Sequence, residues 1–152
     1  MYTQGPPVTE TTQKAAEDAA QRFYANDRAC QALGMKLVEA GPGRSCVTML
    51  VRADMANGHG FCHGGVIFAL ADSAFAFASI SHGQPTVASG AMIDFISPAR
   101  VGEHLTATAQ EQWRGARTGL YDIVVTRSDH TVVAYFRGRS HAVNLTPKAS
   151  PA

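Results

Sequence analysis

The segment from His63 to about Ile80 constrains the fold most strongly. It contains no proline, and its glycines lie only at its start. Apolar side chains occupy nearly every side of a helix drawn through it: Val66, Ile67, Leu70, Ala71, Ala74, Phe75, Phe77 and Ala78. A helix that is apolar all round is a buried helix. At 18 residues without a flanking membrane signature, it predicts the central helix of a globular domain rather than a membrane span.

The rest of the chain predicts mainly antiparallel strands. Two runs at 35–40 and 45–51 flank the turn Gly41-Pro42-Gly43 and predict a hairpin. Further strand-like runs separated by turns follow the central helix, at 86–97, 104–113, 120–127 and 131–143. Since a sheet must bury its inner face, we expect it to wrap around the central helix.

An extra helix is predicted near the N-terminus. Thr11 or Thr12 is a candidate cap, the helix runs to about Cys30, and Gly34 helps to end it. One face is apolar at helical spacing, through Ala16, Ala19, Ala20, Phe23 and Tyr24. The sequence therefore predicts an α+β fold, with one antiparallel sheet around a long central helix and an added N-terminal helix.

Size and charge exclude several classes of protein. The 152 residues match one domain, 1–152, with flexible tails at about 1–10 and 145–152. A net charge of +1 gives no general attraction to nucleic acid or to an anionic membrane. The three cysteines and the absence of a basic, then apolar, leader predict free thiols and a cytoplasmic protein.

The start of the central helix, His63-Gly64-Gly65, carries the first chemical signal. Free backbone N–H groups and the positive end of the helix dipole lie there beside an imidazole. Such a group of donors suits an anion or a developing oxyanion. The same glycines are equally explained by a tight turn into the helix.

Asp72 is the second signal, because it lies on a helix that has hardly any polar face. A buried carboxylate costs free energy unless it is hydrogen-bonded or its pKa rises. One interpretation is a structural aspartate satisfied by the hydroxyl of Ser73 or Ser79. A functional carboxylate is favoured, since carboxylates with perturbed pKa values cluster at functional sites.

His63 and Asp72 are nine residues apart, which is about 13.5 Å along an α-helix and about 180° around it. They point in opposite directions, so one chain does not bring both to one small reacting centre. If both are catalytic, the helix start of one subunit faces Asp72 of another. The spacing therefore predicts at least a homodimer, with an inert monomer.

This pattern resembles a known family. The set of Asn57, His63-Gly64-Gly65 and Asp72 is similar to the signature of hotdog-fold thioesterases, in particular the phenylacetic acid degradation (PaaI-type) acyl-CoA thioesterases. The similarity covers roughly residues 30–143. It extends through residues 70–78, Ile93-Asp94-Phe95, residues 97–100 and residues 119–122.

The resemblance implies roles for the site residues. Asp72 activates the hydrolytic water as a general base, or attacks the thioester itself. The N–H of Gly64 polarises the thioester carbonyl, and Asn57 is a second donor or holds the water. His63 lies near the sulfur. Some relatives hold the water with a hydroxyl on the next strand, where this chain has Ala88, so Ser89 is the candidate here.

The implied substrate is an acyl-CoA, with an aromatic acyl group such as phenylacetyl or a hydroxylated derivative. Candidate binding residues are Gly65 at the helix start, Arg100, Arg137 and Arg139 for the CoA phosphates, and Phe61, Phe68 and Phe75 for the acyl group. A solvated strand face and a plain core explain these arginines and phenylalanines equally well. We expect no cofactor apart from the CoA of the substrate, and a homotetramer.

Other readings of the sequence remain. A non-catalytic acyl-CoA-binding protein needs no costly carboxylate at Asp72. A hotdog enoyl-CoA hydratase is suggested by Asp54 and His59, but the residues between them do not match. A metal site at His59, Cys62 and His63 lacks a fourth ligand, so no metal is expected, and Cys62 lacks a base as a nucleophile.

Overall fold

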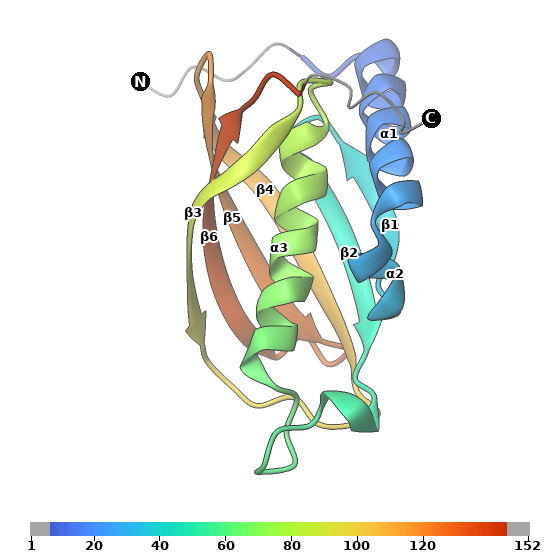
Figure 1. Cartoon of the computed structure of the whole chain (residues 1–152), viewed down its shortest axis with the longest axis vertical. Coiled ribbons are helices and arrows are strands. Elements are labelled where there is room, and N and C mark those ends of the chain that lie inside the picture. The colour runs from blue at the N-terminus through green and yellow to red at the C-terminus, as the bar shows by residue number, and fades with distance from the viewer. Residues whose placement is uncertain (1–6, 146–152) are drawn as a thin grey trace, which may run out of the picture.

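The computed structural model describes residues 7–145. The elements are α1 (Glu10–Asn26), α2 (Arg28–Ala32), β1 (Lys36–Gly41), β2 (Arg44–Leu50), a 3-10 turn (Ala53–Met55), α3 (Gly64–Ile80), β3 (Thr86–Phe95), β4 (His104–Arg114), β5 (Thr118–Arg127) and β6 (Val132–Ala142). All strand pairs are antiparallel, and the strand order is β1-β2-β4-β5-β6-β3. The sheet curves around α3 (Figure 1). The predicted α+β architecture is confirmed.

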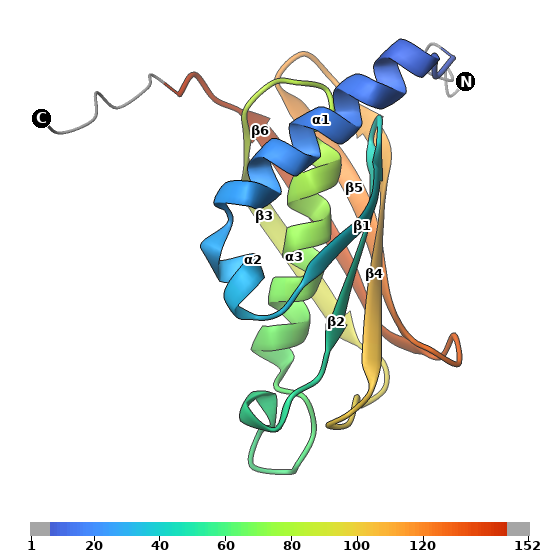
Figure 2. The ribbon, with the colours of Figure 1, turned by 90° about the vertical axis from the view of Figure 1, so that its right-hand side faces the viewer.

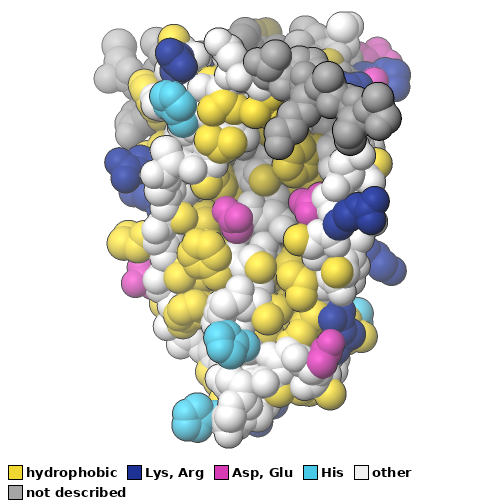
Figure 3. Space-filling view, in the orientation of Figure 1, with side chains coloured by type: hydrophobic (Ala, Val, Ile, Leu, Met, Phe, Trp, Pro, Cys, Tyr) yellow, Lys and Arg dark blue, Asp and Glu magenta, His cyan; other side chains and the backbone are white. Residues whose placement is uncertain are grey.

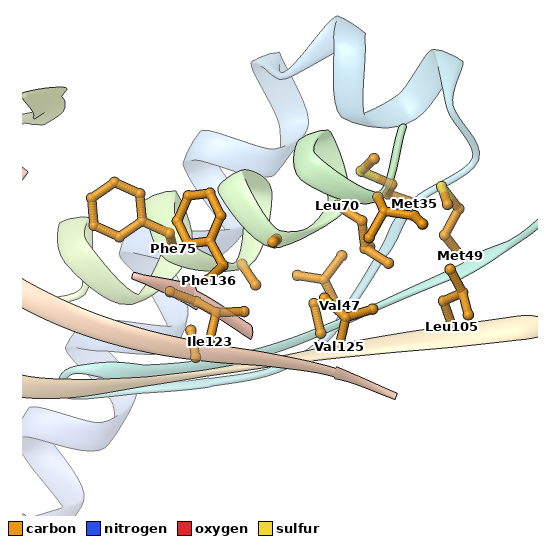
Figure 4. Close-up of a cluster of buried hydrophobic side chains, with 14 of the residues drawn as sticks. Met35, Val47, Met49, Leu70, Phe75, Leu105, Ile123, Val125 and Phe136 are labelled. Atoms are coloured by element: carbon orange, nitrogen blue, oxygen red, sulfur yellow. The ribbon is translucent and has the colours of Figure 1, made fainter. Parts of the chain in front are cut away.

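The core lies between α3 and the inner face of the sheet. Side chains alternate over residues 105–109 of β4 and 119–125 of β5, where every second residue is buried against the helix. On α3 itself Leu70 and Phe77 are fully buried. Figure 4 shows Leu70 and Phe75 of the helix facing Val47, Ile123, Val125 and Phe136 of the sheet. This packing holds α3, and therefore the candidate site residues on it, in one fixed orientation.

The N-terminal helix differs from its prediction. The cap is Thr9 rather than Thr11 or Thr12, because the Thr9 hydroxyl accepts the N–H of Thr12. The prediction of one helix that runs to about Cys30 was wrong, since the helix is interrupted at Asp27. The Asp27 side chain accepts the N–H of Cys30 (2.9 Å) and caps the start of α2. An aspartate competes with the helix for backbone donors in this way.

The flexible N-terminal tail predicted for residues 1–10 extends too far, because Glu10 already belongs to α1. Its first six residues, and residues 146–152 of the predicted C-terminal tail, lie outside the described part of the chain. Within residues 7–145 no helix combines the length and hydropathy needed to cross a membrane.

The two edges of the sheet differ. At one edge, β1 has a bulge and lies beside α1 (Figure 2). The Gln13 side chain of α1 donates to the Ala40 carbonyl of β1 (2.8 Å). At the other edge, β3 is ten residues long, and most of its residues are exposed. Exposed apolar side chains follow this edge: Val87, Met92, Phe95 and, just beyond it, Ile96. Figure 3 shows hydrophobic side chains gathered on the face where α3 and β3 lie.

Candidate active site

Asn57 organises the loop that leads into α3. Its side-chain oxygen accepts the N–H groups of His59 (2.9 Å) and Phe61 (3.2 Å), and its own N–H donates to the Phe61 carbonyl (2.7 Å). Among the described residues no acceptor takes a hydrogen bond from its side-chain NH₂. Asn57 therefore shapes the loop with its oxygen and keeps an amide donor free.

His63 caps α3 at the predicted helix start. Its Nδ1 accepts the N–H of Gly65 (3.0 Å), and its carbonyl accepts the N–H of Val66 (2.9 Å). Since Nδ1 is an acceptor here, the proton of the neutral ring is on Nε2, which is then a donor. The N–H of Gly65, a predicted substrate contact, is already used by His63.

The N–H of Gly64 is left without an acceptor in the described part of the chain. It is the first N–H of α3, at the positive end of the helix dipole, where unpaired donors favour negative charge. A Cβ at Gly64 would lie 3.0 Å from the Phe95 ring, so β3 approaches closely here. The glycine both permits that approach and leaves its N–H open to a ligand.

Asp72 lies on the same helix, half-buried and without a hydrogen bond among residues 7–145. Burial raises the pKa of its carboxyl, and the nearby charge of Asp27 raises it further. The hydroxyl of Ser79 bonds to the Ala76 carbonyl and to Thr86, and within residues 7–145 no hydrogen bond joins Ser73 to Asp72. The alternative of an aspartate satisfied by these serines is wrong.

One chain does not bring the two halves of the site together. Gly64 and Asp72 are eight residues apart in an unbroken helix, which is about 12 Å along its axis. The free N–H points out of the helix end, whereas the carboxylate projects from its side. In a single copy these groups do not reach one carbonyl carbon.

Two of the predicted binding residues lie at the site loop. Arg100 forms a backbone bridge with Phe61, and its guanidinium lies 5.1 Å from the centre of the Phe61 ring. Phe68 packs edge-on against Phe136 of the sheet, at 5.1 Å between ring centres. Phe75 is only 2% exposed and contacts Tyr121, so in the single chain it is a core residue rather than a pocket wall.

The other predicted residues are placed elsewhere. Arg137 and Arg139 project from the outer face of β6, because Gly138 between them meets Phe75 of the core. Arg137 forms a bidentate pair with Asp122, at 2.6 and 2.7 Å. Ser89 lies at a bulge in β3, where its hydroxyl donates to the Arg139 carbonyl (3.2 Å). One chain does not bring these three residues to His63.

Sequence reasoning missed a polar cluster at the other end of α3. A carboxylate oxygen of Glu111 accepts hydrogen bonds from His82 (2.7 Å) and Tyr121 (2.8 Å), and a small pocket lined by Arg114 and Arg117 opens beside it. The available signal was the alternation along β4, which places Glu111 in line with the buried alanines 107 and 109.

The fold and the site together define a class of protein. An antiparallel sheet wrapped around a helix, with a free N–H at the helix start and an unpaired carboxylate further along it, is the arrangement of a hotdog-fold thioesterase. A family model described as "Thioesterase superfamily" matches residues 59–134. The chain belongs to this superfamily and is an enzyme of the thioester hydrolase class.

Two relatives show to which family within this superfamily the chain belongs. Acyl-coenzyme A thioesterase PaaI of Escherichia coli K12 is 46% identical over 127 residues, which are 84% of this chain and 91% of that protein. The solved structure of the E. coli PaaI protein from the phenylacetic acid degradation operon has a TM-score of 0.86 and 44% identity, and covers 88% of this chain and 96% of that one. The chain belongs to the PaaI-type family, as its motif predicted.

A more distant structure comes from Streptococcus mutans UA159 and was solved bound to acetyl CoA. It has a TM-score of 0.70 and 27% identity, and covers 72% of this chain and 89% of that one.

Proposed function

We propose that this enzyme hydrolyses acyl-CoA thioesters to the free acid and CoA, with a preference for phenylacetyl-CoA or its hydroxylated derivatives. The observation that carries the proposal is the unpaired, half-buried carboxylate of Asp72 on the helix whose first N–H, at Gly64, is free. The name and operon of the E. coli relative support the acyl-CoA and phenylacetate parts of it.

The proposed mechanism uses these groups at the points where charge develops. The Gly64 N–H and the free amide of Asn57 donate to the thioester oxygen, which becomes an oxyanion as the carbonyl carbon turns tetrahedral. Asp72 takes a proton from the attacking water, or attacks the carbon itself, and both routes need its ionised form. The Nε2–H of His63 donates to the departing sulfur.

The proposed active unit is a homodimer. Reacting groups must come within about 3–3.5 Å of the substrate atoms, and Gly64 and Asp72 of one chain are too far apart for that. A second copy completes the site if β3 pairs with β3 of the partner, because this edge is long, exposed and apolar. A two-fold axis then creates two sites in each dimer. The homotetramer, the cytoplasmic location and the absence of a cofactor stay predictions.

The test is thiol release from phenylacetyl-CoA, acetyl-CoA and palmitoyl-CoA by the wild type, Asp72→Asn and Asp54→Asn. We expect fastest release from phenylacetyl-CoA and a loss of at least about 10²-fold in kcat/KM for Asp72→Asn, since asparagine cannot accept the proton. Asp54→Asn is the matched control, because Asp54 is exposed and pairs with Arg52 (3.0 and 3.1 Å). It should retain wild-type activity.

The outcomes separate the alternatives. Equal rates on the aliphatic substrates would remove only the aromatic preference. No thiol release, together with intact acyl-CoA co-purifying with the protein, would favour the non-catalytic binding function. Loss of thiol release in Asp54→Asn but not in Asp72→Asn would move the hydrolytic chemistry from α3 to the loop that carries Asp54.

A further inference from the structure

A polar pocket lies at the end of α3 opposite to Gly64, beside the turn that joins β4 to β5. Figures 1 and 2 both show this turn and the end of α3 at the same end of the sheet. The pocket has a volume of about 270 Å³, including the part that is open to solvent. Its lining carries five hydroxyl groups, a histidine, a glutamine and two arginines, and no aspartate or glutamate of the described chain. Such a set of donors suits an anion.

The two arginines, Arg114 and Arg117, lie on a turn that is held by backbone hydrogen bonds. The N–H of Gly115 donates to the Thr118 carbonyl (2.8 Å), and the Arg117 carbonyl accepts the N–H of Ala142 on β6 (2.7 Å). The Arg117 side chain is exposed, and within residues 7–145 no carboxylate forms an ion pair with it. The turn therefore presents a guanidinium whose donors are open to a ligand.

Glu111 is the carboxylate next to this pocket, and it already has partners. One of its oxygens bonds to His82 (2.7 Å) and accepts the Tyr121 hydroxyl (2.8 Å), while the other lies 3.9 Å from Arg114. A distance of 3.9 Å is too long for a hydrogen bond. One negative charge thus faces two positive ones, and the pocket keeps a net positive charge.

A glycine shapes the floor of the pocket. A Cβ at Gly119 would lie 2.7 Å from the Tyr121 ring and 2.8 Å from the Ser140 hydroxyl oxygen. No real Cβ is tolerated so close to its neighbours, so the glycine makes room for both side chains. Both of them line the pocket, and its floor is therefore polar.

The end of α3 opposes an anion less than an ordinary helix end does. Unpaired carbonyl groups give the C-terminus of a helix its partial negative charge. Here the Ser81 hydroxyl donates to the Ala78 carbonyl (2.7 Å), and the N–H of Gly83 donates to the Ile80 carbonyl (2.9 Å). These donors compensate part of the negative charge beside the pocket.

We propose that this pocket binds a small oxyanion, either a phosphate ion or the carboxylate of a small acid, with Arg117 as its main ligand and Arg114 as a second. A guanidinium offers a planar fork of donors that matches both groups, and charge-assisted hydrogen bonds are the strong ones. Gly64 and Ser79 are fifteen residues apart on α3, which is about 22 Å. The inference does not depend on Asp72 or on thioester hydrolysis.

The test is a titration of the full chain with sodium phosphate and, separately, with sodium acetate, at an ionic strength held constant with sodium chloride. Isothermal titration calorimetry should show saturable binding of one ion per chain, and the amide NMR signals of residues 114–118 should shift. We expect Arg117→Gln to weaken binding at least about tenfold, because a charge-assisted contact is lost. Arg22→Gln is the matched control, since Arg22 is an exposed arginine on α1, and it should keep the wild-type affinity.

The two salts identify the ligand: binding of phosphate alone or of acetate alone would support the site and assign its chemistry. Absence of saturable binding with both salts, unchanged affinity in Arg117→Gln, or an equal loss in Arg22→Gln would overturn the proposal. Displacement of the bound ion by CoA would assign the pocket to the substrate site, and a separate anion site would then be excluded. None of these measurements needs turnover, so they decide the inference even if the enzyme releases no thiol.

Discussion

Two carboxylates in this molecule have opposite surroundings. Asp72 has no hydrogen-bond partner in the described chain, and burial followed by the charge of Asp27 raises its pKa. Burial also pushes the pKa of Glu111 upward, but hydrogen bonds from His82 and Tyr121 outweigh it, and the net pKa is lowered. An acid with a raised pKa is a better proton acceptor once ionised, whereas a bonded carboxylate is held in place. Asp72 is therefore suited to catalysis, whereas Glu111 is suited to a structural role.

The free N–H of Gly64 leads to a prediction at the scale of one atom. Gly64→Pro removes this N–H, and proline is tolerated at the first position of a helix, particularly after an extended residue such as His63. Gly64→Ala adds a Cβ near Phe95 but keeps the N–H, so it is the matched control. We expect Gly64→Pro to have about 10²–10³-fold lower kcat than Gly64→Ala in the thiol-release assay, because one oxyanion donor is lost.

Equal kcat in the two Gly64 variants, with both folded by circular dichroism, would show that this N–H does not contact the developing oxyanion. Any loss shared by both variants would then come from the contact with Phe95.

At the scale of elements, the two edge strands explain how the chain avoids indiscriminate sheet pairing. The β1 edge is covered in part by α1 and interrupted by a bulge, two of the devices that protect sheet edges. The β3 edge carries exposed apolar side chains instead. A long apolar edge is an aggregation hazard unless a partner covers it, so its survival in a folded protein supports a specific partner strand.

This contrast is tested by two substitutions at matched positions. Met92 on β3 and Val38 on β1 are each 62% exposed, so neither supports the core. Met92→Lys places two positive charges, related by the two-fold axis, at the proposed interface. We expect the dimer dissociation constant, measured by sedimentation, to rise at least about tenfold, and activity to fall at low protein concentration. Val38→Lys should behave as the wild type. The reverse result would move the interface to β1.

At the scale of the whole molecule, the active site is divided between copies in the proposed dimer. Each chain contributes a helix start to one site and Asp72 to the other, so every chain takes part in both reactions. The core that packs α3 into the sheet therefore also determines the distance between the two halves.

The division predicts complementation between two inactive variants. When Gly64→Pro and Asp72→Asn are mixed under conditions that exchange subunits, half of the dimers are mixed, and each mixed dimer has one site without either change. We expect thiol-release activity to recover to about one quarter of wild type. No recovery, with subunit exchange verified by mass spectrometry, would place the complete site within one chain.

Much of this architecture was predictable from local sequence. The proline-free apolar run predicted α3 to within one residue of its start, because helix periodicity is a property of neighbouring residues. The strands were predicted with errors of one or two residues at their ends for the same reason. The break at Asp27 was missed, because only the burial of Cys30 in the core shows that a second helix should start there.

For the site, the sequence by itself determined the family motif and the separation of His63 from Asp72, since the rise per residue of a helix is constant. Only the tertiary structure decided that the Gly64 N–H is free while that of Gly65 is bonded, and that no serine satisfies Asp72. The effect of the Asp27 charge on Asp72 also depends on contacts between segments that are distant in the chain, and so does the exposure of the β3 edge. Local sequence patterns do not show such contacts.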